Sequence, residues 1–298
     1  MRVLHIDTGR EMRGGQWQVL RLVEALVEAG HEAVLLSPRG SPLFEKAAER
    51  GLAPRPLGII TLAREPASAD LIHAHDARGH SLAAIAGRAP LVVSRRVAFA
   101  IGGNPASRWK YARADHYIAV SEHVKSGLVE AGVPADKISV VYDGVPLGEP
   151  ARGGRLIVAP ATADPAKGAA LVREAAQIAG LEVRFSEHLE EDLRDARMFL
   201  YITHREGLGS AALLAMAAGV PVLASRVGGL QEIIEDGRSG VFTENDPEAI
   251  AAGMRLLAED GGLRRRLGEC ARERVREKFS VAAMVRGTLD VYTRILSC

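Results

Sequence analysis

The sequence predicts an α/β fold in which two doubly wound domains, each with a parallel sheet, face a cleft. The chain has 298 residues, which is more than one hydrophobic core usually supports. Short apolar strands alternate with amphipathic helices along most of its length, the pattern of a parallel sheet. Proline and glycine interrupt this alternation over residues 146–154, PLGEPARGG, which indicates an interdomain linker.

Before the linker, apolar periodicity predicts strands separated by helices. The expected strands are residues 3–6, 32–36, 71–74, 91–94, 116–120 and 138–141, and the expected helices are residues 17–28, 42–49, 81–86 and 122–131. After the linker a second series begins. Its strands are residues 156–159, 182–185, 198–202 and 221–224, and its helices are residues 169–179, 190–196 and 210–218.

Composition excludes several classes of protein. Hydrophobic residues make up 47% and charged residues 25% of the chain, as in an ordinary soluble protein, and the net charge of +1 argues against bulk binding of nucleic acid. Cys270 and Cys298 form neither a metal-binding spacing nor a disulfide framework. The N-terminus begins as a strand without signal-peptide features, and no apolar run approaches the ~18 residues of a membrane span. We therefore expect a cytoplasmic protein.

Glycine and basic residues concentrate in the loops that follow the predicted strands. These loops are residues 8–16, 75–80, 95–104, 160–168, 204–210 and 226–229. Ligands of open parallel sheets bind beyond the carboxyl ends of the strands, so the composition favours a cleft for an anionic ligand. The alternative is that these residues simply terminate strands.

The most informative loop leads into the helix 210–218. Gly207 and Gly209 allow the backbone to pass close to a ligand, and the helix beginning at Ser210 directs its first N–H groups and positive dipole end to the same place. This arrangement predicts a phosphate site.

Several motifs occur in the order found in a known family: GG near residue 14, AGHEAVLLS, ADLIHAHD, ARADHYIAVSEHVKSGLVEAGVPADKISVVYDGV, KG, and REGLGSAALLAMAAGVPVLASRVGGLQEII. Their succession resembles the retaining GT-B glycosyltransferases of family 4, also called group 1. The resemblance implies two Rossmann-like domains: an acceptor domain, residues 1–148, and a nucleotide-sugar donor domain, residues 149–279. It also implies that a last helix, residues 280–298, packs back onto the first domain.

The same resemblance assigns roles on the donor side. Glu206 would lie against the donor sugar and Lys167 would neutralise the diphosphate. Relatives hold the ribose with a second glutamate, but that position is Leu214, and their diphosphate-binding arginine corresponds to Thr162. A strand and helix of the usual donor domain are also missing. The predicted donor and phosphate contacts are Gly15, Thr162, Lys167, His204, Gly207, Leu208, Gly209 and Ser210.

On the acceptor side, the resemblance points to Gly14, His75 and Asp76, with His75 as a catalytic candidate beside Glu206. Many relatives have a histidine after the strand 91–94, where this chain has Arg95 and Arg96. An arginine stays protonated and cannot act as a general base, but it can bind an anionic acceptor. No DxD-type aspartate pair forms a convincing metal site, so we expect neither metal nor cofactor, with the nucleotide sugar as substrate.

Each of these residues also has a structural interpretation. Glu206 can cap the following helix or pair with Arg205, Lys167 can be solvated, and His75 can be packed at the end of a buried strand. Arg95 and Arg96 can be surface charges, and the glycines at 14 and 15 can serve only the turn into the first helix.

The favoured hypothesis is a retaining glycosyltransferase that moves sugar from a nucleotide sugar to a hydroxyl of a carbohydrate or lipid-linked acceptor, in bacterial surface glycan or glycolipid synthesis. One alternative is a sugar-nucleotide binder or partner subunit without transfer activity; another is a sugar-nucleotide epimerase. The basic and aromatic segment 107–115 leaves open a peripheral contact with the inner face of the membrane. Oligomeric state, donor and acceptor stay undetermined.

Overall fold

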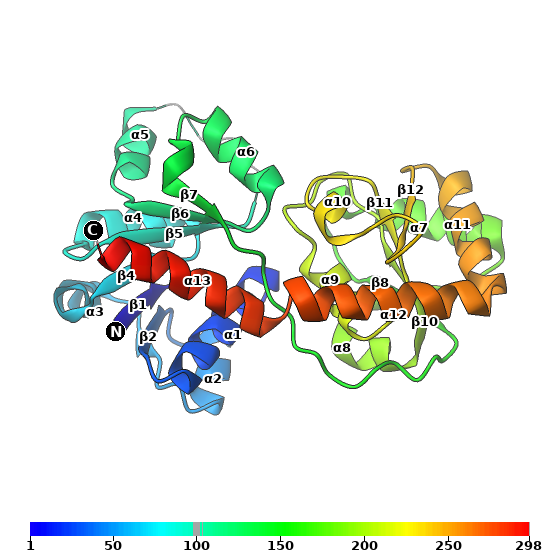
Figure 1. Ribbon diagram of the computed structural model, residues 1–298, viewed down its shortest axis with the longest axis horizontal. Helices are drawn as coiled ribbons and strands as arrows, with labels where there is room; N and C mark the ends of the chain where they lie inside the picture. The colour runs from blue at the N-terminus through cyan, green and yellow to red at the C-terminus, as the bar shows by residue number, and fades with distance from the viewer. Residues whose placement is uncertain (98–101, 103, 298) are drawn as a thin grey trace. The chain divides into compact units, whose positions relative to one another are not determined.

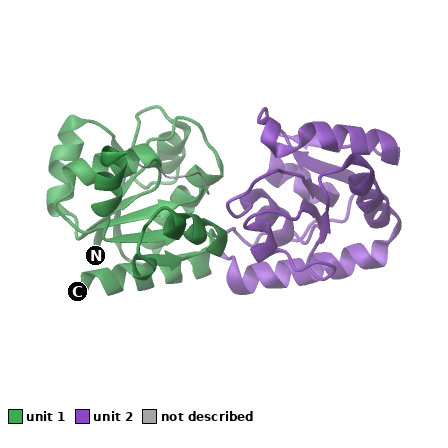
Figure 2. Cartoon of the chain, turned by 90° about the horizontal axis from the view of Figure 1, so that it is seen from above, with its two compact units in different colours: residues 1–144, 281–298 green, residues 145–280 purple. Residues whose placement is uncertain are grey.

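The structure, a computed structural model, describes residues 1–97, 102 and 104–297. The chain forms two compact units, which Figure 2 distinguishes by colour: residues 1–144 with 281–298, and residues 145–280. The sequence divided the chain after residues 148 and 279. Within the described residues 141–155 no helix or regular strand forms, and this stretch contains the proline and glycine cluster. Residues 98–101 and 103 of the predicted loop 95–104, and Cys298, lie outside the described residues.

The first unit is a parallel sheet covered by helices (Figure 1). Its strands are β1 (Arg2–Ile6), β2 (Glu32–Ser37), β3 (Arg55–Pro56), β4 (Leu71–Ala74), β5 (Leu91–Arg95), β6 (His116–Ala119) and β7 (Ile138–Val140). Its helices are α1 (Gly14–Glu28), α2 (Pro42–Glu49), α3 (Ile59–Arg64), α4 (Ala77–Ala86), α5 (Pro105–Ala112), α6 (Glu122–Glu130) and α13 (Val281–Leu296), with 3-10 turns η1 (Glu65–Ser68) and η2 (Ala135–Lys137). The strand order is β3-β2-β1-β4-β5-β6-β7.

The second unit has a five-stranded parallel sheet in the order β12-β11-β10-β8-β9. Its strands are β8 (Leu156–Pro160), β9 (Arg184–Ser186), β10 (Ala196–Tyr201), β11 (Val222–Ser225) and β12 (Val241–Thr243). Its helices are α7 (Ala169–Ala179), α8 (Leu189–Asp192), α9 (Ser210–Ala217), α10 (Leu230–Ile233), α11 (Pro247–Glu259) and α12 (Gly261–Lys278), with 3-10 turns η3 (Pro165–Lys167) and η4 (Leu193–Asp195). The predicted fold class, two doubly wound α/β domains, is confirmed.

The last helix, α13, is part of the first unit and packs against α1. Met284, Val285, Val291 and Tyr292 share a hydrophobic core with residues of α1, such as Val19. Tyr292 is fully buried, and its hydroxyl lies 2.5 Å from Nδ1 of His73 on β4. The final residues of the chain therefore complete the core of the unit that contains its first residues.

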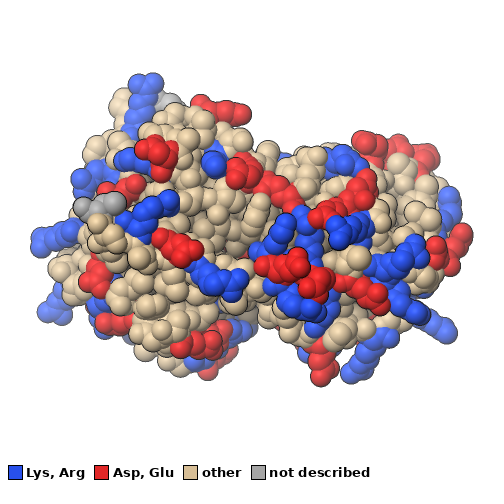
Figure 3. Space-filling model, viewed as in Figure 1, with Lys and Arg blue, Asp and Glu red and all other residues tan. Residues whose placement is uncertain are grey.

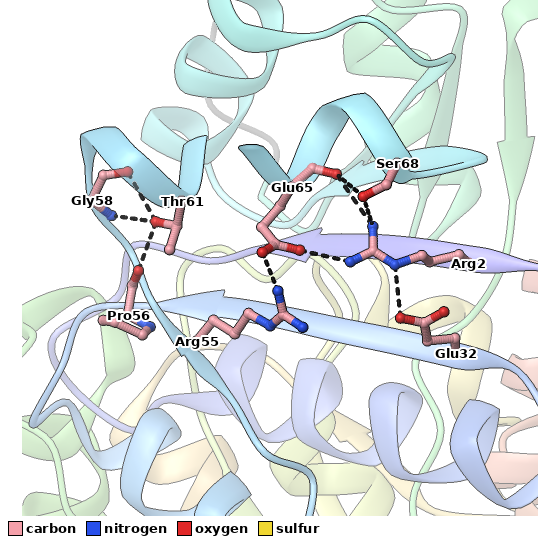
Figure 4. Close-up of polar contacts among 8 residues, drawn as sticks. All are labelled: Arg2, Glu32, Arg55, Pro56, Gly58, Thr61, Glu65 and Ser68. Atoms are coloured by element: carbon pink, nitrogen blue, oxygen red, sulfur yellow. Dashed lines mark hydrogen bonds and ion pairs between the residues drawn. The ribbon is translucent and has the colours of Figure 1, made fainter. Parts of the chain in front are cut away.

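A polar cluster ties β1 to the segment before β4 (Figure 4). Arg2 donates to Glu32 at 2.7 Å and to Glu65 at 2.6 Å, and Glu65 also pairs with Arg55. Burial by itself would raise the pKa of Glu65, but the hydrogen bonds from the two arginines outweigh it and leave that pKa lowered. The segment 55–68, for which periodicity predicted no element, is thus joined to the sheet by the pairing of β3 with β2 and by these ion pairs.

Differences from the predicted elements have local causes. Helix α4 begins at Ala77 instead of residue 81, because the Asp76 carboxylate accepts hydrogen bonds from the N–H groups of Arg78 and Gly79 and caps the helix. Helix α1 begins at Gly14 instead of residue 17, so both glycines of the GG motif are helical. The strand predicted at 182–185 is Arg184–Ser186.

Candidate functional site

The strand order of the second unit locates a ligand site. In chain order its five strands are arranged 2-1-3-4-5, so the direction of winding reverses between β8 and β10. Doubly wound sheets bind ligands at such a switch point, in the crevice outside the carboxyl ends of the strands. Lys167 lies in the loop after β8 and Glu206 in the loop after β10.

These two side chains are in direct contact. Lys167 Nζ lies 2.6 Å from Glu206 Oε2, and the Tyr201 hydroxyl donates to the same oxygen at 2.6 Å. The lysine side chain is 28% exposed and the glutamate 14%. Burial raises the pKa of Tyr201 well above its ordinary value, and the Glu206 charge and hydrogen bond add to that rise. The carboxylate is therefore held in one orientation by a cation and a neutral phenol.

Glycines shape the loop between Glu206 and α9. Gly209 has a φ of +111°, a backbone conformation that favours glycine. A Cβ at this position would also lie 2.6 Å from Leu230 Cδ2, so both the backbone and the packing favour glycine here. Gly229 donates its N–H to the Glu206 carbonyl at 3.2 Å, and a Cβ on it would lie 2.1 Å from the Gly207 oxygen. The two glycine turns of the motif thus pack against each other beneath the start of α9.

Hydrogen bonds also join the loops that follow neighbouring strands of the second sheet. Thr203 donates its hydroxyl to the Ala166 carbonyl at 3.1 Å, and its N–H bonds Ser225 Oγ at 2.8 Å. Ser225 Oγ in turn lies 2.5 Å from Asn245 Oδ1, and Asn245 Nδ2 donates to the Thr203 carbonyl. Loops after four strands are cross-linked by these bonds, which makes the crevice rigid.

The remaining predicted donor-side residues have different surroundings. His204 is exposed and Ser210 begins α9, whereas Leu208 as a whole residue is only 2% exposed and its neighbours Gly207 and Gly209 are also buried. Thr162 accepts a hydrogen bond from the Asp164 N–H and shapes its own loop. Leu214 lines a pocket of about 360 Å³ together with Glu190 and Arg194. A leucine offers no oxygen or nitrogen to a ribose, and the described residues that bring carboxylates to this pocket are Glu149 and Glu190.

The first unit has its own topological switch point between β1 and β4. Thr8, after β1, donates its N–H and hydroxyl to the Asp76 carboxylate at 2.5 and 2.9 Å. Asp7 accepts from the Gly9 N–H and from Gln16 Nε2. Burial raises the pKa of Asp7, and the nearby Asp76 charge raises it further. Two carboxyl groups thus lie at this edge beside the start of α1.

Arg96 joins this group, whereas Arg95 does not. Arg96 Nε lies 3.2 Å from Asp143 Oδ1, its Nη1 is 3.5 Å from the His75 carbonyl, and a Cβ on Gly15 would lie 3.6 Å from its Cδ. The positive charge of Arg95 instead acts on Tyr111 and Tyr117. The two adjacent arginines therefore contact different groups, because successive side chains along a strand point to opposite faces of the sheet.

His75 is buried in a histidine cluster. His5 Nδ1 lies 2.9 Å from His75 Nε2, and His73 Nε2 lies 2.8 Å from Ser94 Oγ. Burial lowers the pKa of His5 to about 3, and burial with neighbouring positive charge lowers those of the other two well below the ordinary value. The catalytic role assigned to His75 remains a prediction, and its 5% exposure favours a role in packing.

The same cluster is the place in the described residues where a metal would find nitrogen ligands. One ligand atom from each of His5, His73 and His75 lies within 4.8 Å of the others. Neutral imidazoles are metal ligands, yet both His73 nitrogens already bond Tyr292 and Ser94. His5 Nε2 and His75 Nδ1, by contrast, are buried without a hydrogen-bond partner among the described residues.

Sequence reasoning missed several residues of these two sites. Asp7 falls between the predicted strand 3–6 and the predicted loop 8–16, and Tyr201 lies within the predicted strand 198–202, so neither was singled out. Asp143 and Asn245 are brought in from distant strands. The position of an acidic or hydroxyl group at the carboxyl end of a predicted strand is the signal that would have found Asp7 and Tyr201.

Comparisons with known proteins agree with this geometry. The family model described as Glycosyltransferase Family 4 matches residues 12–149, and the model described as Glycosyl transferases group 1 matches residues 165–274. The D-inositol 3-phosphate glycosyltransferase of Streptomyces avermitilis is 39% identical over 108 residues, which is 36% of this chain and 23% of that protein. The N-acetyl-alpha-D-glucosaminyl L-malate synthase of Bacillus anthracis is 34% identical over 111 residues, 37% of this chain and 29% of that protein. The matched segments thus span less than a third of these curated relatives.

Solved structures share the whole fold at low identity. Anabaena HepE in complex with UDP superposes with a TM-score of 0.86 and 16% identity, covering 99% of this chain and 100% of that one. Sucrose-phosphate synthase from Thermosynechococcus elongatus gives a TM-score of 0.75 and 18% identity, with full coverage of both chains. The two family models match in order along most of the sequence, and the two parallel-sheet units have GT-B neighbours. This chain belongs to glycosyltransferase family 4 (group 1), with the GT-B fold.

Proposed function

We propose that the protein is a glycosyltransferase that uses a nucleotide-sugar donor. The observation that carries this proposal is the Lys167–Glu206 pair at the switch point of the second unit, beside the first turn of α9. Lys167 and the N–H groups of that turn are suited to a diphosphate, while the Glu206 carboxylate is suited to accept hydrogen bonds from sugar hydroxyls.

The reaction breaks the bond between the anomeric carbon and the diphosphate oxygen, and the oxygen of the acceptor hydroxyl bonds to that carbon with retention of configuration while its proton passes to the departing diphosphate. Negative charge develops on the departing nucleoside diphosphate. Lys167 and the dipole of α9 stabilise that charge in the crevice, the task that a divalent cation performs in other sites. We therefore propose a metal-independent transfer, for which excess EDTA leaves the rate unchanged.

The acceptor binds to the first unit in this proposal. Gly14 and Gly15 open the first turn of α1 to a close approach by a ligand, and Arg96 and Asp76 lie at the same sheet edge. A carbohydrate or lipid-linked hydroxyl fits this polar edge, and the cytoplasmic face of a bacterial membrane is the corresponding location. The described residues contain no helix long and apolar enough to cross a membrane.

A thermal-shift panel of UDP, GDP, ADP and dTDP sugars tests the donor, followed by hydrolysis and transfer assays on any compound that stabilises the protein. One base is expected to raise the melting temperature, and its sugar nucleotide is expected to be turned over. Binding without turnover on a broad acceptor panel would favour the alternative of a sugar-nucleotide binder. Leu214 and Thr162 are the residues that suggest this alternative, because they replace charged side chains of active relatives. No stabilisation by any of the four would contradict the donor assignment.

A further inference from the structure

An arginine-lined pocket lies at the amino edge of the second sheet, where β10 begins, α9 ends and α12 begins. Its volume is about 630 Å³. Among the described residues that line it are five arginines and one acidic residue, Glu269: the arginines are Arg152, Arg197, Arg264, Arg265 and Arg272. Because Lys167 and Glu206 follow the carboxyl ends of β8 and β10, this pocket is separated from them by the length of the strands, roughly 17 Å for the six residues of β10.

The arginines of the pocket lack acidic partners. In the described part of the chain none of the five forms an ion pair with a carboxylate, although other arginines of α12 do: the largely buried Arg274 pairs with Glu235, and the exposed Arg276 pairs with Glu273. Figure 3 shows basic and acidic groups intermingled on the face of the molecule that it displays. The pocket is thus a local excess of positive charge on a chain whose net charge is only +1.

Arg197 is the most informative of the five. Its Nε is buried and has no hydrogen-bond partner among the described residues. Burial, together with the positive charge of Arg264, lowers the pKa of Arg197. Because Arg197 lines the pocket, an anion bound there would supply the acidic partner that its guanidinium group lacks among the described residues.

Two of the arginines already have structural contacts that fix the wall of the pocket. Arg264 donates to the carbonyls of Leu257 and Ala258 at the end of α11, and Arg272 donates to those of Ala217 and Gly148. Carbonyl oxygens carry only partial negative charge, so these hydrogen bonds do not neutralise the two guanidinium groups. Both therefore still contribute positive charge to the pocket. Arg152, Arg197 and Arg265 are left to face a ligand, and the 18-residue helix α12 begins in the pocket at Gly261.

We propose that this pocket binds a small molecule bearing phosphate groups, with Arg152, Arg197 and Arg265 as its cationic ligands. Guanidinium groups present paired N–H donors that match the oxygens of a phosphate, and several of them together suit a diphosphate or a phosphate ester better than a single carboxylate. Neither Lys167 nor Glu206 lines this pocket, but it shares Pro150, Arg152 and Ala218 with the pocket that Leu214 lines, so R265Q and R197M are the variants confined to it. The proposal does not depend on the donor chemistry proposed above. Its occupancy would act on α9, whose first turn lies in that crevice and whose last turn contacts Arg272.

Isothermal titration of the full chain with inorganic pyrophosphate tests the proposal. R152Q and R265Q change exposed side chains and should each weaken binding by about tenfold or more, since each removes a charge-assisted contact. R197M should weaken it similarly. R266Q, an exposed arginine of α12 that does not line the pocket, is the matched control and should bind like the parent protein.

K167M separates this pocket from the donor crevice, where pyrophosphate can also bind. The proposal expects K167M to retain an arginine-dependent binding event. It is overturned if R152Q and R265Q bind pyrophosphate as tightly as the parent, or if K167M alone abolishes all binding. Failure of R197M to fold would leave the test to the two exposed variants.

Discussion

Replacing Gly229 with alanine should disturb the donor crevice without altering any polar side chain in it. The added Cβ would lie 2.1 Å from the Gly207 oxygen and 2.7 Å from Leu208 Cα, both backbone atoms that no rotamer change can move. To reach ordinary contact distance the loop 206–208 must retreat by about 1 Å, which also strains the hydrogen bond from Gly229 N–H to the Glu206 carbonyl. Overpacking of this kind costs about 1–3 kcal/mol of folding free energy.

The functional effect should exceed the loss of stability. A displacement of about 1 Å in a positioning group lowers a reaction rate on the order of a hundredfold, so kcat should fall by that amount in protein that is still folded. Urea unfolding followed by circular dichroism measures the loss of folding free energy. Steady-state transfer or donor hydrolysis measures the fall in kcat.

Gly127 supplies the matched control for this substitution. It lies inside α6 with open space around its Cα, so G127A should stabilise the protein by about 0.5–1 kcal/mol through helix propensity. Unchanged stability and unchanged turnover in G229A would refute the reasoning, because they would mean that the two glycine turns are not in contact.

Three further predictions concern charges. E206Q should lower kcat by about tenfold or more while the affinity for the nucleotide changes little, because the proposed contact is with the sugar. L214E should tighten binding of a nucleoside diphosphate by about threefold to tenfold, measured by titration calorimetry, if this position faces the ribose, since it adds a hydrogen-bond acceptor for the hydroxyls. Glu65, whose pKa is lowered by Arg2 and Arg55, should stabilise the fold at neutral pH, and this contribution should fade as the pH falls below the ordinary value of 4.5.

The sign of the Glu65 effect follows from proton binding. Below pH 4.5 the unfolded chain takes up a proton at Glu65 before the folded chain does, so acid favours unfolding. The difference in unfolding free energy between the parent and E65Q should therefore shrink as the pH falls from 6 to 3. A difference that stays constant over that range would contradict the ion-pair account. For L214E, weaker nucleotide binding would show that the ribose lies elsewhere, and E206Q with full activity would remove Glu206 from the mechanism.

Periodicity predicted the sheets well because buried parallel strands are continuous apolar runs. The helix at Ala169–Ala179 was placed with both ends correct, since Gly168 and Gly180 bound it. Periodicity could not find β3 or α3, because β3 has two exposed residues and α3 buries none of its side chains. β3 is a strand because it pairs with β2, and the segment that follows it is tied down where Glu65 bonds Arg2 and Arg55, so both depend on tertiary contacts.

The candidate site was predictable in part for a similar reason. Glycine turns before a helix are local signals, so Gly207 and Gly209 were found from the sequence. Lys167 and Glu206 are 39 positions apart in the sequence, so their contact could not be predicted. Each residue was predicted to contact the ligand separately. The histidine cluster was missed altogether, because alternation along β1 and β4 conceals that His5 and His73 lie side by side in register.

The central claim is that the crevice beside Lys167 binds the diphosphate of a nucleotide sugar. The most direct test is calorimetric titration of the parent protein and K167M with the preferred nucleoside diphosphate and with the corresponding nucleoside. The account predicts that the diphosphate binds the parent at least about tenfold more tightly than the nucleoside, and that K167M removes most of that advantage. Equal affinity of the diphosphate for the parent and K167M would contradict it.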